Sequence, residues 1–239
     1  MMKELIQEKG LWAAALLCLG GLAAGFPFYQ MEAPLAPGSF LDFCQAALQG
    51  QVLLFLVPVA GVLPMGAAFV RESSSGFLKL YLTRTDRMEY MKRKTVQVYM
   101  GGFLPFFLAG VWMLALAFLF VYPLELKGSV DGGKLWEVAG VLLRVSLAGG
   151  IAAGAAGIFA AVFMNYYMAY GLPFVCYYLL VILKERYFAG MYAMYPAEWV
   201  AAEQDWGTDG SGIWVFLGVF SAVVMLLHGL ALYVRLREV

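Results

Sequence analysis

The 239-residue sequence has little charge, only three cysteines and a single histidine. Charged residues make up 13% of the chain and hydrophobic residues 63%, and the mean hydropathy is +0.78. Cys18, Cys44 and Cys176 lie in apolar segments without CxxC spacing, so we expect buried thiols rather than a disulfide or a metal site. The composition excludes an ordinary water-soluble domain, because a surface this apolar needs lipid around it.

Motifs for catalysis are also missing. Residues 128–135, GSVDGGKL, come close to a phosphate-binding loop, but Leu135 stands where a magnesium-binding hydroxyl is required, and no strand precedes the segment. A serine hydrolase would need Ser211 beside His228, yet on one helix these residues would lie about 25 Å apart, and proton transfer needs about 3 Å. We therefore predict that the chain is not an enzyme, has no ATPase of its own, and binds no cofactor or metal.

Long apolar runs predict six membrane spans, near residues 10–29, 44–70, 95–122, 137–164, 166–183 and 213–234. The stretch 137–183 is almost unbroken, but it is far too long for a hydrocarbon core about 30 Å thick and must fold back. Asn165, Gly171 and Pro173 predict the turn. Without a repeat, a soluble domain or a low-complexity tract, we expect an all-α integral membrane protein with one transmembrane domain, residues 1–239.

The distribution of Lys and Arg predicts the orientation, because these residues accumulate in cytoplasmic segments. With the N-terminus inside, 11 of the 16 basic residues fall on the inner side, and seven of them lie in residues 71–94. Ten of the 16 acidic residues then fall outside. Both termini are therefore predicted to be cytoplasmic, and the segment 184–212 between the fifth and sixth spans is predicted to lie outside.

Residues 71–94, RESSSGFLKLYLTRTDRMEYMKRK, form a polar island of net charge +4 in this hydrophobic chain. Its short helix FLKLYLTR carries too many apolar residues for a solvated loop, so it should lie against something. Asp86 and Glu89 have the spacing of a capping box, which predicts a second helix that begins at Arg87 and runs into the third span. The island is either a loop that only sets orientation or a docking element for another protein.

The same run resembles the cytoplasmic loop between the second and third spans of ATP-binding cassette (ABC) permease subunits of the ABC-2 type. In that family an acidic residue, a glycine, a short hydrophobic helix, a basic residue and a lysine follow one another, here Glu72, Gly76, Leu80, Arg87 and Lys94. A proline usual before the basic residue is replaced by Thr85 and Asp86. The resemblance implies that residues 73–84 form a cytoplasmic coupling helix seated in a groove of a separate ATPase subunit. The docking region it implies comprises Glu72, Gly76, Phe77, Leu80, Tyr81, Arg84 and Arg87.

By this resemblance the chain is expected to be the membrane-spanning permease subunit of an ATP-driven exporter in a bacterial plasma (inner) membrane. Its substrate would be amphipathic, such as a peptide antibiotic, a drug or a lipid, and would move by alternating access. The implied partners are cytoplasmic ABC ATPase subunits, which bind the ATP and magnesium, a second permease subunit and membrane lipids, but no nucleic acid. The competing hypothesis is a non-transporting membrane sensor or scaffold that docks another cytoplasmic protein.

Residues 184–212 are too polar to span a membrane but carry many aromatic side chains. Pro196 can open a helix that contains Trp199. We expect one or two short outer helices that lie in the interface or re-enter it and form a lid over the transport path. The alternative is an ordinary loop of interfacial aromatic residues.

Two ionisable residues lie inside predicted spans. Arg144 is expected to extend outward toward Glu137, and the alternative is a contact with an anionic substrate in the transport path. His228 near the inner end of the last span is expected to be a helix-packing group, and the alternative is a polar role in the transport path.

Cysteine labelling from outside intact cells tests the predicted orientation. In a variant without the native cysteines, a cysteine introduced at Ser129 or Asp209 should react with a membrane-impermeant reagent, because both positions are predicted to face outward. A cysteine at Ser74 should react only after the membrane is permeabilised. Labelling of position 74 in intact cells would show that the orientation is wrong.

Overall fold

The computed structural model describes residues 2–31, 33–126, 131–207 and 210–237, without the side chains of residues 2–4, 77 and 79. Within these ranges the chain is helical and has no β-strand, which confirms the predicted all-α class. The α-helices are α1 Met2–Gln7, α2 Lys9–Gly25, α3 Ser39–Leu48, α4 Gln51–Ala60, α5 Ala68–Ser74, α6 Phe77–Leu82, α7 Arg87–Phe120, α8 Gly132–Phe163, α9 Tyr166–Arg186, α10 Pro196–Ala201 and α11 Gly212–Arg237. Three short 3₁₀ turns are η1 Phe28–Gln30, η2 Tyr122–Leu124 and η3 Tyr192–Met194.

Several of these helices are long and apolar enough to cross a membrane. In the described part of the chain four pass this test, namely α8, α9, α11 and the segment Arg87–Leu124 that contains α7. The helices α3 and α4 meet at a bend of 50°, and counting the pair as one span gives five. α2 is apolar but has only 17 residues. The chain thus has the character of a multi-pass membrane protein, and the layout with six spans stays a prediction.

The fold-back between the fourth and fifth predicted spans is confirmed. α8 ends at Phe163, Met164 adopts a left-handed conformation with φ 51°, and the Asn165 side chain accepts a hydrogen bond from the Tyr167 backbone N–H at 2.7 Å. Gly171 and Pro173, expected in the turn, instead lie within α9. A single asparagine cap is therefore enough to restart the helix after one left-handed residue.

The second predicted span, residues 44–70, is divided into the end of α3, all of α4 and the start of α5. Gly50 separates the first two helices, and a turn over residues 61–67 separates α4 from α5. At Gly61 the backbone lies so close to α8 that an added Cβ would be 2.8 Å from the Gly149 carbonyl oxygen. Close packing on α8 thus accompanies the break in this span.

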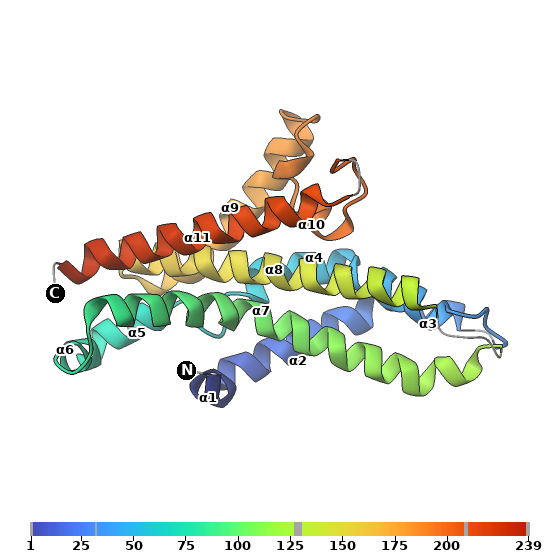
Figure 1. Ribbon diagram of the computed structural model, residues 1–239, viewed down its shortest axis with the longest axis horizontal. Helices are drawn as coiled ribbons and strands as arrows, with labels where there is room; N and C mark the ends of the chain where they lie inside the picture. The colour runs from blue at the N-terminus through green and yellow to red at the C-terminus, as the bar shows by residue number, and fades with distance from the viewer. Residues whose placement is uncertain (1, 32, 127–130, 208–209, 238–239) are drawn as a thin grey trace.

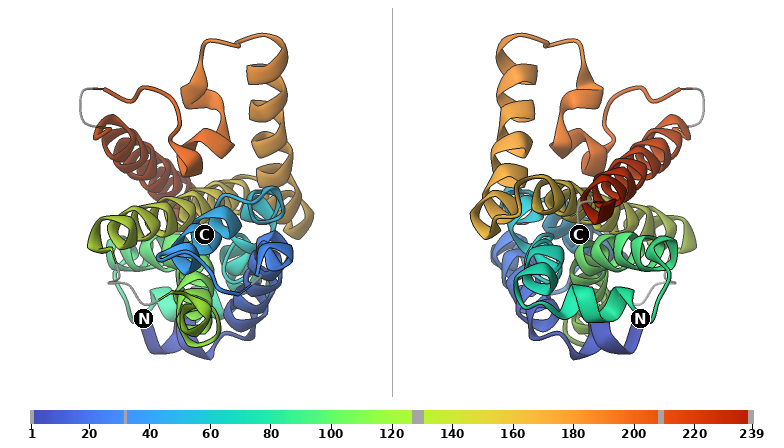
Figure 2. Two further views of the ribbon diagram at one scale, coloured as in Figure 1. Left: turned by 90° about the vertical axis from the view of Figure 1, so that its right-hand side faces the viewer. Right: turned by 90° about the vertical axis from the view of Figure 1, so that its left-hand side faces the viewer.

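α8 lies at the centre of the molecule, between α7 and α11, and also contacts α4, α9 and α10 (Figure 1). α9 rises away from the other helices, and α10 lies between α9 and α11 (Figure 2). α9 buries only Ala169 and Pro173, whereas Val175, Leu179 and Ile182 are exposed. In a bilayer this exposed apolar surface would meet lipid or another membrane helix.

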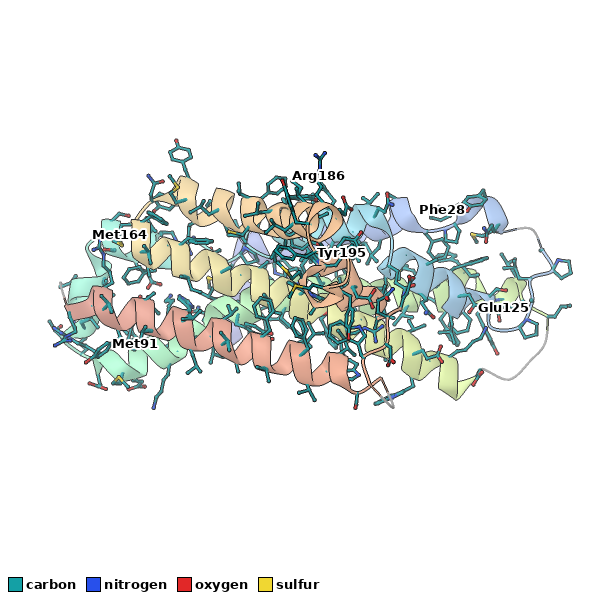
Figure 3. The ribbon with its side chains drawn as sticks, turned by 90° about the horizontal axis from the view of Figure 1, so that it is seen from above. Phe28, Met91, Glu125, Met164, Arg186 and Tyr195 are labelled. Carbon is teal, nitrogen blue, oxygen red and sulfur yellow. The ribbon has the colours of Figure 1, made fainter. Side chains whose placement is uncertain are left out.

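The two ends of the molecule differ in charge. α5, α6 and the C-terminal end of α11 lie toward one end (Figure 1), as do Met91 and Met164, while Phe28 and Glu125 lie toward the other (Figure 3). The basic residues of the polar island, together with Arg235 and Arg237, therefore share one end. At the opposite end Glu125 accepts hydrogen bonds from the backbone of Gly38 and Phe40, at the N-terminus of α3.

Gly102 on α7 provides a test of the close packing. A Cβ at this position would overlap the Ala153 Cβ and the Gly149 carbonyl oxygen of α8. Gly102→Ala should therefore destabilise the protein by about 1–3 kcal/mol, as overpacked cores do, and lower the unfolding temperature in detergent. Gly218→Ala on α11 is the matched control, because apart from the adjoining backbone of its own helix nothing lies within 4 Å of its added Cβ. An unfolding temperature that is unchanged in Gly102→Ala would contradict this account of the packing.

Candidate functional site

The main cluster of buried charge lies where α5 meets α7, and we call Glu72, Tyr90, Lys94 and Gln97 the polar junction. Tyr90 and Lys94 are four residues apart on α7, so both side chains face α5. Lys94 Nζ lies 2.5 Å from Glu72 Oε1, and the Tyr90 hydroxyl donates to Glu72 Oε2 at 2.7 Å. The junction therefore fixes the position of α5 against the start of the long helix α7.

Lys94 is only 4% exposed. Besides the Glu72 carboxylate, its ammonium group contacts Gln97 Oε1 at 3.2 Å. A buried ammonium group is tolerated only when it is paired and hydrogen-bonded. Glu72 is thus the counter-charge that allows Lys94 to lie inside the molecule.

A polar cavity of about 270 Å³ adjoins the junction. On its far side Arg71 of α5 donates to Glu8, between α1 and α2, at 2.8 Å. Partial burial disfavours the charge of Arg71, but the hydrogen bond to Glu8 and its negative charge outweigh this effect and raise the pKa of the guanidinium group. Arg93 of α7 donates to the Tyr81 hydroxyl of α6 at 3.1 Å. Charged and aromatic groups around one cavity therefore join α5, α6, α7 and the N-terminal segment.

α6 itself is shorter than the predicted helix over residues 73–84. Residues 73 and 74 belong to α5, and Gly76 with φ 74° makes the turn between α5 and α6. α7 begins at Arg87 as predicted, because the Asp86 side chain accepts from the Met88 backbone N–H at 3.1 Å. A left-handed residue and a side-chain cap thus set the bounds of α6.

Leu78 and Leu80 of α6 have opposite surroundings. Leu78 is 2% exposed and packs in a cluster that includes Phe69 of α5, Tyr90 of α7 and Leu232 of α11. Leu80 is 70% exposed. Arg84 and Arg87 are exposed after the helix, and the side chain of Phe77 lies outside the described residues. One face of α6 is therefore held by the bundle while Leu80 is presented outward.

Arg144 holds the segment between α9 and α11 rather than reaching Glu137. Its Nε donates to the Val200 carbonyl oxygen at 2.9 Å, and a terminal nitrogen lies 3.4 Å from the Ala201 carbonyl oxygen. These carbonyls end α10, where a cation is favoured by the helix dipole. The guanidinium group also lies 5.9 Å from the centre of the Trp214 ring.

The predicted short helices are present as η3 and α10, and Pro196 is the first residue of α10. Trp199 is buried, donates to the Ala193 carbonyl oxygen at 2.8 Å, and packs against two aromatic rings of α11, Phe216 and Phe220. Tyr195, in the same segment, lies partway along the long axis rather than at its far end (Figure 3). Pro196 and Trp199 thus belong to one packed segment that folds back toward α8, where Arg144 holds its end.

His228 lies apart from that segment. It is 1% exposed, and neither ring nitrogen has a hydrogen-bond partner among the described residues. The ring packs on Gly157 of α8, where an added Cβ would lie 2.5 Å from His228 Cε1. This geometry agrees with the helix-packing interpretation. Within the described ranges no group of three or more His, Cys, Asp or Glu side chains is placed to hold a metal ion.

The sequence singled out Glu72 and Lys94 but gave no reason to pair them, and it missed Tyr90, Gln97 and the Arg71–Glu8 contact. The four-residue spacing of Tyr90 and Lys94 was the one signal available, since it places both residues on one face of the predicted helix. No protein-family model and no curated protein matches the chain. Function is therefore inferred from the residues and their geometry.

Removal of the Glu72 charge tests the polar junction. Glu72→Gln should destabilise the protein by about 3 kcal/mol, because it leaves the buried Lys94 charge without its counter-charge. The double variant Glu72→Gln with Lys94→Met should recover part of this loss, since no buried charge then remains. Unfolding in detergent measures both effects.

Glu8→Gln is the control, because the partner Arg71 side chain is largely exposed and such pairs contribute less than about 1 kcal/mol. If Glu72→Gln is as stable as the unaltered protein, the buried pair does not have the structural role assigned to it.

Proposed function

We propose that this protein is the membrane-spanning permease subunit of an ATP-driven ABC exporter of the ABC-2 type. It would move an amphipathic substrate, such as a peptide antibiotic, a drug or a lipid, by alternating access, with ATP hydrolysed by separate cytoplasmic subunits. The membrane would be a bacterial plasma (inner) membrane, with both termini in the cytoplasm. The proposal rests on the resemblance of residues 71–94 and on the geometry of α6.

The exposure of Leu80 is the observation that carries the proposal. α6 lies at the basic end of the molecule, its Leu78 side chain is buried by the bundle, and its Leu80 side chain is exposed. An exposed leucine on a short helix between charged residues fits a groove on another protein better than it fits water. A groove on an ATPase subunit would bury this leucine.

A docked α6 would have a direct mechanical connection to the membrane helices. Arg93 and Tyr81 join α6 to α7, and the Glu72–Lys94 pair joins α5 to α7. α7 then packs along α8 over much of its length. A push on α6 would therefore shift α7 against α8 rather than bend a loop, because packed helices transmit displacement.

Two other surfaces fit the rest of such a complex. The exposed apolar face of α9, with Val175 and Leu179, would meet a second permease subunit or lipid. The segment around α10, fastened by Arg144 and filled by Trp199, would be the lid of the transport path on the outer side.

Co-purification tests the docking surface. Leu80→Asp should release the ATPase subunit from the detergent-solubilised complex, because it places a charge where the groove requires an apolar side chain. Leu126→Asp is the matched control, since Leu126 is 54% exposed at the opposite end of the molecule. The amounts of co-purifying ATPase and of ATP hydrolysis measure the effect, and membrane insertion should be equal in both variants.

An ATPase that co-purifies equally with both variants would contradict the role of α6. A partner that is lost from Leu80→Asp but has no ATPase activity would instead support the alternative, a membrane sensor or scaffold.

A further inference from the structure

A surface groove of about 680 Å³ runs between α7 and α11 at the basic end of the molecule. Most of its lining is apolar, and Leu226 and Leu230 of α11 are largely exposed there. Gly229 lies between these two leucines in the sequence, so at this position no side chain of α11 fills the groove. The full lining comprises Met88, Met91, Lys92, Thr95, Val96, Met225, Leu226, Gly229, Leu230 and Tyr233.

Positive charge gathers at one end of this groove. α7 and α11 run in opposite directions, so Lys92 and Tyr233 lie toward the basic end, while Val96 and Met225 lie deeper along the bundle. Among the described residues the Lys92 ammonium group has no ion pair or hydrogen bond. The Arg237 guanidinium carbon lies 5.6 Å from the centre of the ring of Tyr233, a residue that lines the groove.

We propose that this groove binds one anionic phospholipid. Lys92 and Arg237 would hold the phosphate of the headgroup, and an acyl chain would lie along Val96, Met225 and Leu226 toward the middle of the bilayer. An amphiphile with a negative head and an apolar tail matches a groove with a cationic mouth and an apolar floor. This proposal goes beyond the transport function, and it does not depend on an ATPase partner.

Charge favours a lipid over a second copy of the chain. A symmetric pair of copies meeting at this groove would bring Lys92 and Arg237 of each copy close to the same cations of the other, and like charges across an interface are unfavourable. A zwitterionic lipid would fill the apolar part, but its own ammonium group offsets the negative charge of its phosphate, so it would be held less tightly by the two cations. An anionic lipid satisfies both parts of the groove.

The same arrangement occurs on the other side of α11. There a second apolar groove of about 390 Å³ lies between α8 and α11, and Arg235 is its one charged lining residue. Ile158, Leu227 and Val234 are among the apolar residues that line it. A cationic residue at the basic end of an apolar groove is therefore found on both flanks of α11, which agrees with contact between this helix and the inner headgroup layer.

Native mass spectrometry of the full chain in detergent tests the proposal. Phosphatidylglycerol and phosphatidylcholine with identical acyl chains are titrated separately, and inorganic phosphate is the third probe. Phosphatidylglycerol should bind more tightly than phosphatidylcholine, and phosphate alone should not bind. Lys92→Gln should weaken phosphatidylglycerol binding on the order of fivefold, the effect of one basic residue near an anionic lipid.

Two further variants separate the parts of the groove. Lys9→Gln removes the same charge from an exposed lysine outside the groove and should leave binding unchanged. Gly229→Leu should fill the groove and weaken both lipids, and size-exclusion chromatography checks that it folds.

Three results would overturn the proposal. They are equal binding of the two lipids, equal loss of phosphatidylglycerol binding in Lys92→Gln and Lys9→Gln, and disulfide formation between two copies that carry Leu226→Cys as their single cysteine. The last result would assign the groove to an interface between copies.

Discussion

The close approach of α7 to α8 is the constraint on which the rest of the structure depends. At Gly102 and Gly149 the two helices meet with no room for a side chain, and the backbone at Gly61 joins the same contact. Lipid tails are as apolar as leucine, so membrane helices associate by close van der Waals packing rather than by the hydrophobic effect. Glycine at the contact is what makes such packing possible. The packed pair of α7 and α8 then sets the positions of the elements attached to its two ends.

The packed pair of α7 and α8 connects two otherwise separate groups of candidate functional residues. α7 begins in the polar junction, where Lys94 is paired with Glu72, and α8 carries Arg144, which fastens the end of α10. The first contact is a buried ion pair, and the second is a partly buried set of hydrogen bonds from a guanidinium group to backbone carbonyls. Burial makes both contacts stronger than they would be in water. The two groups are therefore joined by a pair of packed helices rather than by loops.

The sequence predicted local features well and tertiary contacts poorly. The helix start at Arg87 and the fold-back at Asn165 follow from short-range capping by Asp86 and by Asn165 itself, so both could be predicted. The turn over residues 61–67 contains Gly61, Pro64 and Gly66, which are local helix-breaking signals, but no local pattern shows that Gly61 packs against α8. Arg144 shows the same limit. Helical spacing places Glu137 near its face, but the carbonyl end of α10, 56 residues away in sequence at Val200, provides its partner.

The side chains of His228 and Thr95 mark the place where hydrogen bonding inside the bundle is incomplete. Both ring nitrogens of His228 and the Thr95 hydroxyl are buried between α7, α8 and α11, and within the described part of the chain they have no hydrogen-bond partner. An unsatisfied buried polar group costs about 1–3 kcal/mol. The contact persists because Gly157 admits the imidazole ring and the surrounding apolar packing outweighs this cost. A displacement of α11 that admitted water would recover part of the lost hydrogen bonding. Opening the contact of α11 with α7 and α8 would therefore cost less than opening an equally large contact without unsatisfied polar groups.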